Sequence, residues 1–148
     1  MSRAGAIIVS GGSGSRMGRP KQFLPLGGST VAEWSLKCFV SMPEVEHIVL
    51  VLGEDAVKEH GPRLSGGRIT VVAAGPTRMG SVRNGFAALK PGLDVVAVHD
   101  GARSLVTPEI VRATYKTPAY RGAAVAAVPV KDTLKKVPKG GDVVAATP

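Results

Sequence analysis

An apolar strand that runs straight into a glycine-rich loop decides the fold, and together they read AGAIIVSGGSGSRMGRPK over residues 4–21. Residues 4–9 form a short continuous apolar run, which is typical of a strand buried on both faces. The loop over residues 10–20 carries glycines that let backbone N–H groups converge on an anion without a Cβ in the way. Three cations, Arg16, Arg19 and Lys21, lie within six positions. We interpret the loop as a cradle for phosphate groups.

This loop departs from two familiar phosphate-binding patterns. The dinucleotide fingerprint Gly-x-Gly-x-x-Gly would need a glycine where Met17 stands. The Walker pattern needs Gly-Lys-Ser/Thr, whereas Lys21 lies between Pro20 and Gln22. A flexible Gly-Ser turn without a ligand is the alternative, but flexibility alone does not explain the clustered cations.

Outward from the loop, apolar runs alternate with amphipathic segments. Further buried strands are expected over residues 47–52, 68–73, 94–99 and 122–130, and helices are expected from Thr30, over 55–60, over 79–89 and from Thr107. The helix over 79–89 is expected to direct Val82, Phe86 and Leu89 to one face. Buried strands separated by helices indicate an α/β fold, Rossmann-like and three-layered, with a mostly parallel sheet.

Ligands of such sheets bind beyond the carboxyl ends of the strands. The loops that should meet there begin at Ser10, Gly53, Ala74, Asp100 and Pro129. Past residue 130 the pattern changes, because 131–137 alternate like an exposed strand, 138–142 read as a turn and 143–146 as a returning strand. We therefore expect a core over residues 1–130 and the start of a projecting β-hairpin arm over 131–148.

Charge and composition favour small phosphorylated ligands. A net charge of +8 over 148 residues attracts anions, while an aromatic content of 4% leaves few stacking platforms for single-stranded nucleic acid. A basic nucleic-acid-binding domain stays as an alternative. The single cysteine, Cys38, lies in an apolar helical run and is expected to be buried and inert, which fits a reducing compartment. No apolar run approaches the roughly 20 residues of a membrane span, so we expect a cytoplasmic protein that binds neither membranes nor nucleic acid.

Five motifs carry a resemblance to a known family. They are GGSGSRMG with PKQFL at 11–24, EWSL at 33–36, GPTRMGSV at 75–82, VHDGAR at 98–103 and PVKDT at 129–133. The first resembles the signature of sugar- and polyol-phosphate nucleotidyltransferases. In this order, the set is similar to the 2-C-methyl-D-erythritol 4-phosphate cytidylyltransferases of isoprenoid precursor synthesis. The resemblance implies a nucleotidyltransferase-type fold whose core over residues 1–130 binds the nucleotide and carries catalysis.

The resemblance also implies a reaction and a set of site residues. In that family CTP and magnesium bind first, the phosphate of the polyol then attacks the α-phosphorus of CTP, and pyrophosphate leaves. Arg16 and Lys21 match the catalytic pair that stabilises the α-phosphate. The implied binding residues are Ser10, Gly11, Gly12 and Gly14 for the triphosphate and base, Gly75 and Ser81 for the cytosine edge, Asp100 for Mg²⁺ and substrate, and Arg103 and Thr133 for the polyol phosphate. Thr133 would reach across a homodimer interface through the arm.

Several positions depart from the family pattern. Ser10 and Gly11 stand where two alanines are commoner, and Gly101 stands where alanine is commoner. Family members also continue past the arm with further substrate-binding residues, so the 148 residues resemble a C-terminally truncated member, and we expect weak CTP binding and slow turnover. Two alternatives stay open: a ribitol 5-phosphate cytidylyltransferase, and a non-catalytic nucleotide-binding fragment. The KDTLK stretch at 131–135 favours methylerythritol phosphate over ribitol phosphate as the acceptor.

Overall fold

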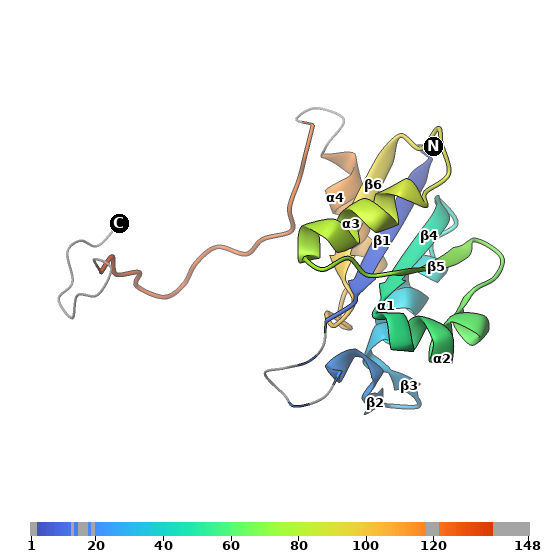
Figure 1. The fold of residues 1–148 in the computed structure, drawn as a ribbon. Helices are drawn as coiled ribbons and strands as arrows, with labels where there is room; N and C mark the ends of the chain where they lie inside the picture. The colour runs from blue at the N-terminus through green and yellow to red at the C-terminus, as the bar shows by residue number, and fades with distance from the viewer. Residues whose placement is uncertain (1–2, 13, 15–17, 19, 118–121, 138–148) are drawn as a thin grey trace.

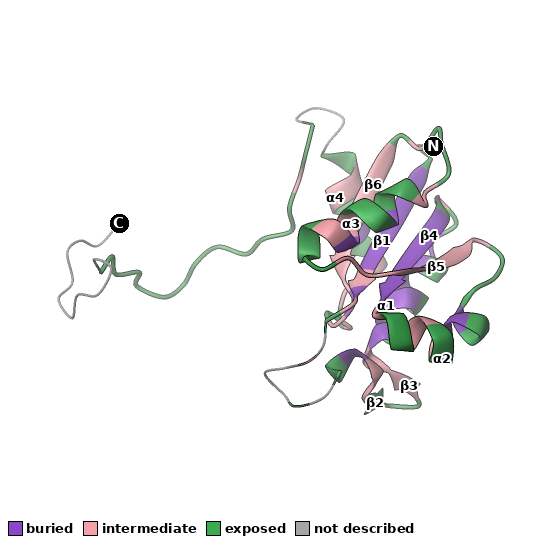
Figure 2. Ribbon diagram, in the orientation of Figure 1, coloured by how far each residue is buried: buried purple, intermediate pink, exposed green. Residues whose placement is uncertain are grey.

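The fold is built on a four-stranded sheet, all of whose neighbouring strands are parallel (Figure 1). The computed structural model describes residues 3–12, 14, 18, 20–117 and 122–137. The strands are β1 (Ala4–Ser10), β4 (Val45–Leu52), β5 (Ile69–Ala73) and β6 (Val95–Asp100), in the order β5-β4-β1-β6. The central strands β1 and β4 are almost wholly buried, as the apolar runs predicted (Figure 2).

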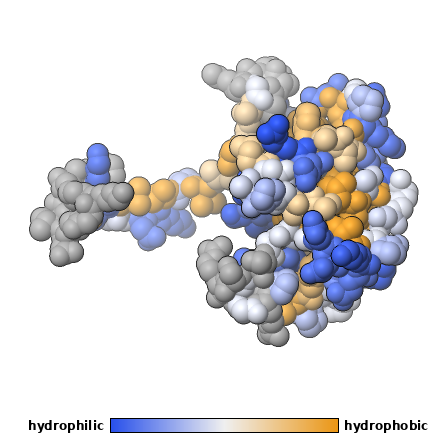
Figure 3. Space-filling model, in the orientation of Figure 1, coloured by the Kyte–Doolittle hydropathy of each residue, from blue (hydrophilic) through white to orange (hydrophobic). Residues whose placement is uncertain are grey.

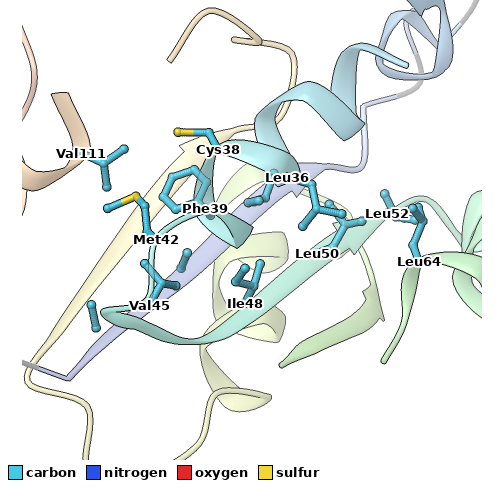
Figure 4. Close-up of a cluster of buried hydrophobic side chains, with 13 residues drawn as sticks. Leu36, Cys38, Phe39, Met42, Val45, Ile48, Leu50, Leu52, Leu64 and Val111 are labelled. Atoms are coloured by element: carbon cyan, nitrogen blue, oxygen red, sulfur yellow. The ribbon is translucent and has the colours of Figure 1, made fainter. Parts of the chain in front are cut away.

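Helices cover both faces of the sheet, which confirms the three-layer α/β fold. The helices are α1 (Val31–Val40), α2 (Glu54–Leu64), α3 (Arg78–Ala87) and α4 (Pro108–Lys116). On one face, side chains of α1, α2 and α4 form one buried cluster with Ile8, Ile48 and Leu50 (Figure 4). Cys38 belongs to this buried cluster, as expected. On the other face, α3 covers Ile7, Val49 and Val51. No helix among the described residues is long and apolar enough to cross a membrane.

The connection between β1 and α1 spans residues 11–30. After the glycine-rich loop come a 3₁₀ turn, η2 (Lys21–Phe23), and a two-stranded hairpin of β2 (Pro25–Leu26) and β3 (Ser29–Thr30), which was not predicted. The helix expected from Thr30 is confirmed, and it begins with a capping box. The Thr30 hydroxyl accepts from the Glu33 amide at 3.3 Å, and the Glu33 carboxylate accepts from the Thr30 amide at 2.7 Å.

The orientation of α3 differs from the prediction. Phe86, expected on one helix face with Val82 and Leu89, is 63% exposed, whereas Ser81 and Gly85 are buried. A Cβ at position 85 would lie 2.5 Å from Cγ2 of Ile7, so the glycine lets the helix backbone approach the sheet closely. The close approach of α3 to the sheet at Gly85 therefore decides which face of the helix is buried, and it leaves Phe86 exposed.

The segment after α4 also differs from the prediction. Residues 122–130, expected to form a fifth strand, are in no strand, and Val125 is 88% exposed. Residues 131–137 also form no strand, with Lys136 an isolated bridge residue; positions 138–148 of the expected arm lie outside the described residues. The segment leaves the body with hydrophobic and hydrophilic side chains both exposed (Figures 1 and 3). Apolar composition predicted a strand here, but a strand needs a paired edge, and β6 ends the sheet without pairing with this segment. Pro129 therefore does not join the sheet edge.

Candidate functional site

The carboxyl ends of the strands meet at one edge, as the parallel topology predicted. In the register of the sheet, Ser10 lies beside Leu52, Leu52 beside Ala73, and Val9 beside Asp100. A pocket of ≈ 730 Å³ opens at this edge, a size typical of a small-molecule site. It is lined by Val9, Ser10, Gly11, Gly12, Lys21, Gln22, Gly75, Pro76, Thr77, Arg78, Ser81, Asp100, Ala102 and Arg103.

Most of the residues predicted from the sequence line this pocket. They are Ser10, Gly11, Gly12, Lys21, Gly75, Ser81, Asp100 and Arg103. Gly14 adopts a left-handed φ of 69°, which favours glycine, but does not line the pocket. Arg16 lies outside the described residues. Thr133 lies on the exposed segment after α4 and does not line the pocket of its own chain. The site roles of these three residues stay predictions.

Gln22 fixes the first part of the glycine-rich loop. Its buried side-chain amide donates to the carbonyl oxygens of Ser10, at 2.9 Å, and Gly12, at 2.8 Å. Lys21 precedes it in η2, so the same turn that anchors the loop sets Lys21 at the pocket wall. Sequence reasoning did not assign Gln22 a role, because nothing in a single sequence separates a buried glutamine from an exposed one.

Two glycines of the site are required by close packing between loops. A Cβ on Gly11 would lie 2.3 Å from Cβ of Ala74, which directly follows β5. A Cβ on Gly75 would lie 2.6 Å from the backbone carbon of Gly80, in α3. The backbones of the first loop and of the β5–α3 loop can therefore approach each other, which leaves their polar groups at the pocket wall.

Ser81 secures the turn that leads into α3. Its buried hydroxyl accepts from the amide of Gly75 at 3.1 Å and donates to the carbonyl of Thr77 at 3.0 Å. Thr77 caps the helix by accepting from the amide of Gly80 at 3.0 Å. The positive end of the α3 dipole therefore borders the pocket, where it favours an anion.

Asp100, at the end of β6, is held by two arginines. One carboxylate oxygen accepts from the guanidinium of Arg78 at 3.0 Å, and the other accepts from Nε of Arg103 at 3.1 Å. Partial burial pushes the pKa of this carboxyl up, but the hydrogen bonds from Arg78 and Arg103 outweigh burial and hold the pKa below its usual range. The sequence analysis gave Arg78 no site role, because its contact with Asp100 spans 22 positions and leaves no signal in the sequence.

The turn after β6 is fixed from α1. Ser35, in the predicted EWSL motif, donates its hydroxyl to the carbonyl of Gly101 at 3.0 Å. His99 packs against Phe39 with ring centroids 5.3 Å apart, and burial lowers its pKa. His99 is thus a packing residue.

The donor set fits a cation that arrives with a phosphorylated ligand. Asp100 is the sole carboxylate among the described residues that line the pocket, and no three His, Cys, Asp or Glu residues in the described part of the chain gather as a metal site. Magnesium commonly takes one or two protein carboxylates and completes its shell with substrate phosphates and water. The residues present therefore fit magnesium with a nucleotide and do not fit an all-protein metal site.

The site combines a glycine-rich loop after the first strand, a lysine in the turn that follows the loop, and a carboxylate at the end of the adjacent strand. These features define an α/β protein of the nucleotidyltransferase type. The family model "2-C-methyl-D-erythritol 4-phosphate cytidylyltransferase" (IspD) matches residues 4–148. The chain belongs to this family.

Individual relatives agree with the family match. The chain is 37% identical, over 97% of its length, to the 2-C-methyl-D-erythritol 4-phosphate cytidylyltransferase of Alkaliphilus metalliredigens, and 36% identical, over 92%, to the bifunctional enzyme IspD/IspF of Desulfotalea psychrophila. The crystal structure of 4-diphosphocytidyl-2C-methyl-D-erythritol synthase from Anaerococcus prevotii is 29% identical with a TM-score of 0.86 over 99% of this chain. The chain spans 62%, 36% and 64% of the lengths of these three proteins.

Proposed function

We propose that this chain binds CTP at the pocket and transfers the cytidylyl group to 2-C-methyl-D-erythritol 4-phosphate, with release of pyrophosphate. One observation carries the proposal: Gly11, Gly12, Lys21, Gly75 and Asp100, predicted as site residues from motifs far apart in the sequence, line a single pocket. Family membership supports both the nucleotide and the acceptor.

The obstacle to the reaction is charge, because an anionic nucleophile must approach an anionic electrophile. A phosphate oxygen of the acceptor forms a bond to the α-phosphorus of CTP, and the bond from that phosphorus to the bridging oxygen breaks, so that pyrophosphate leaves with the electron pair. Lys21, together with Arg16, stabilises the charge that gathers on the α-phosphate, while backbone amides of the glycine-rich loop orient the triphosphate. Magnesium, bound through the phosphates and Asp100, would supply further charge neutralisation.

The acceptor end of the site is proposed from Arg103 and Thr133. Arg103 lies at the pocket wall and supplies a guanidinium for the polyol phosphate. Thr133 lies on the exposed segment 122–137, which carries Val125 and Leu134 at its surface. The exposure of these apolar side chains supports a homodimer that would bury them, in which Thr133 completes the partner's site. We place the enzyme in the non-mevalonate isoprenoid pathway and in the cytoplasm.

Nucleotide selectivity tests the proposal directly. CTP with magnesium should raise the melting temperature of the 148-residue chain more than ATP, GTP or UTP does, because a ligand that binds only the folded state stabilises it. Lys21→Ala should reduce the CTP shift, whereas Lys90→Ala, an exposed lysine outside the pocket, should retain it. Equal shifts with all four nucleotides would contradict the proposal.

The acceptor is tested by release of pyrophosphate. With CTP as the nucleotide, pyrophosphate should be released faster with 2-C-methyl-D-erythritol 4-phosphate than with ribitol 5-phosphate. Faster release with ribitol 5-phosphate would contradict the proposed acceptor and support the alternative one. Cytidylyl transfer itself would still stand.

A further inference from the structure

Both oxygens of the Asp100 carboxylate are engaged by guanidinium groups from different parts of the chain. Arg103 follows Asp100 by three residues, whereas Arg78 is the first residue of α3 and comes from the opposite wall of the pocket. The Arg78 contact therefore joins the start of α3 to the end of β6 across the site that the nucleotide is proposed to occupy.

Both ion pairs of Asp100 are weak enough for a stronger partner to replace them. The side chains of Arg78 and Arg103 are 64% and 76% exposed, so solvent screens both ion pairs. Exposed ion pairs shift an equilibrium by no more than about fivefold. A triphosphate beside Arg78, at the positive end of the α3 dipole, would offer that guanidinium a stronger, multiply charged partner.

The same bridge disfavours a bare cation. Asp100 with its two arginines carries a net charge of +1, and Lys21 adds a further cation to the pocket wall. A divalent ion that approaches alone would be repelled and would have to displace a guanidinium. A divalent ion that arrives with a triphosphate brings net negative charge, and its phosphates can take the displaced arginine.

We propose that Arg78 is an exchangeable counter-ion of Asp100 that couples binding of the divalent cation to binding of the nucleotide. Without ligand, Arg78 pairs with Asp100 and keeps the carboxylate from a cation. When the triphosphate binds, Arg78 moves to a phosphate and Asp100 becomes a cation ligand. The identity of the anion rests on the proposed function, but the exclusion of bare cations by Arg78 does not. Because coupling between two ligands is reciprocal, the cation strengthens nucleotide binding by the same factor.

Binding of Mn²⁺ alone tests this proposal, with free Mn²⁺ followed by electron paramagnetic resonance. Arg78→Ala should bind Mn²⁺ about threefold to fivefold more tightly than the unaltered chain, the range expected when one exposed ion pair is removed. The gain should vanish in the Arg78→Ala/Asp100→Asn double variant. Arg83→Ala removes an exposed guanidinium of the same helix that does not line the pocket, and should change Mn²⁺ affinity by less.

Binding of CTP in the presence of EDTA, which removes divalent cations, tests the role of Arg78 in nucleotide binding. Arg78→Ala and Arg78→Gln should each weaken CTP binding several-fold. Arg78→Ala would then raise the affinity for the cation and lower the affinity for the nucleotide. Unchanged or weaker Mn²⁺ binding in Arg78→Ala, or an equal gain in Arg83→Ala, would overturn the counter-ion proposal. Loss of CTP selectivity in the unaltered chain would instead overturn the proposed function, since the Mn²⁺ measurement contains no nucleotide.

Discussion

The hydroxyl of Ser10 occupies the space into which a side chain at position 101 would point. A Cβ built on Gly101 would lie 1.8 Å from Oγ of Ser10 and 3.1 Å from its Cβ. Oγ of Ser10 is also the one buried side-chain polar atom in the described part of the chain that has no hydrogen-bond partner. The serine at the end of β1 and the glycine after β6 are therefore sterically matched. This pairing gives a physical reason why both positions depart together from the family's commoner alanines.

A double-mutant cycle measures this match. Gly101→Ala should lower the free energy of unfolding by about 1–3 kcal/mol, because an overpacked side chain must displace its neighbours. Ser10→Ala should be neutral or stabilising by up to about 1 kcal/mol, because it removes a buried hydroxyl without a partner. The double variant should recover most of the loss, with a coupling of at least about 1 kcal/mol in urea unfolding. Simple additivity of the two substitutions would contradict the steric match.

Two glycines of α3 should respond oppositely to the same substitution. Gly85→Ala should destabilise the chain by about 1–3 kcal/mol, because its Cβ would lie 2.5 Å from Cγ2 of Ile7 and 3.1 Å from Cγ2 of Val51. Gly80→Ala meets its neighbours only at 3.4 Å and beyond, and should gain up to about 1 kcal/mol from helix propensity. Thermal and urea unfolding of the two variants compare them directly. Stabilisation by Gly85→Ala would show that α3 can move off the sheet without cost.

Gln22 offers a test of the loop anchor. Gln22→Ala should cost about 1–3 kcal/mol of stability by removing both hydrogen bonds to the loop carbonyls, and should weaken CTP binding because the loop loses its fixed path. Gln22→Glu should be more harmful than Gln22→Ala near neutral pH, because a buried carboxylate would face the carbonyl oxygens of Ser10 and Gly12 without a donor. Urea unfolding and CTP titration of both variants give the ranking, and equal stability of the two would contradict the anchor.

The elements that sequence reasoning predicted well are those whose signal is local. The strand over residues 4–9 and the helices expected from Thr30 and Thr107 are all found in the structure. Each depends on a signal within a few residues: the apolar run of β1, the capping box at Thr30 and the proline at the start of α4. The edge of the sheet that holds the pocket followed from topology, since parallel strands bring their carboxyl ends together.

What escaped prediction depends on contacts between distant residues. Residues 122–130 have strand-like composition, but a strand also needs a paired edge, and composition says nothing of that. The exposure of Phe86 follows from the small residue at position 85, which sets which face of α3 lies on the sheet. The bridge between Arg78 and Asp100 joins two motifs that the sequence shows only separately.

Glu33 should make stability depend on pH in the acid range. Its carboxylate accepts from the Thr30 amide at 2.7 Å and pairs with Arg63, and these contacts, the Thr30 bond first, lower its pKa from 4.5 to about 2. Because the pKa is lower in the folded state, the stabilisation is complete above pH 4.5 and is lost as the pH falls towards about 2.

The contribution of Glu33 can be isolated with one substitution. Linkage gives at most about 3 kcal/mol, and solvent screening reduces this towards about 1 kcal/mol. Glu33→Gln should therefore be less stable than the unaltered chain at pH 6, and the difference should shrink as the pH falls from 4.5 to about 2. Urea unfolding of both chains across this range measures that difference. The titration of other carboxylates, such as Glu44 and Asp100, affects both chains equally and cancels in the comparison. A difference that stays constant with pH would mean that the Glu33 carboxylate titrates alike in the folded and unfolded states, and that the capping box owes its stability to geometry rather than to charge.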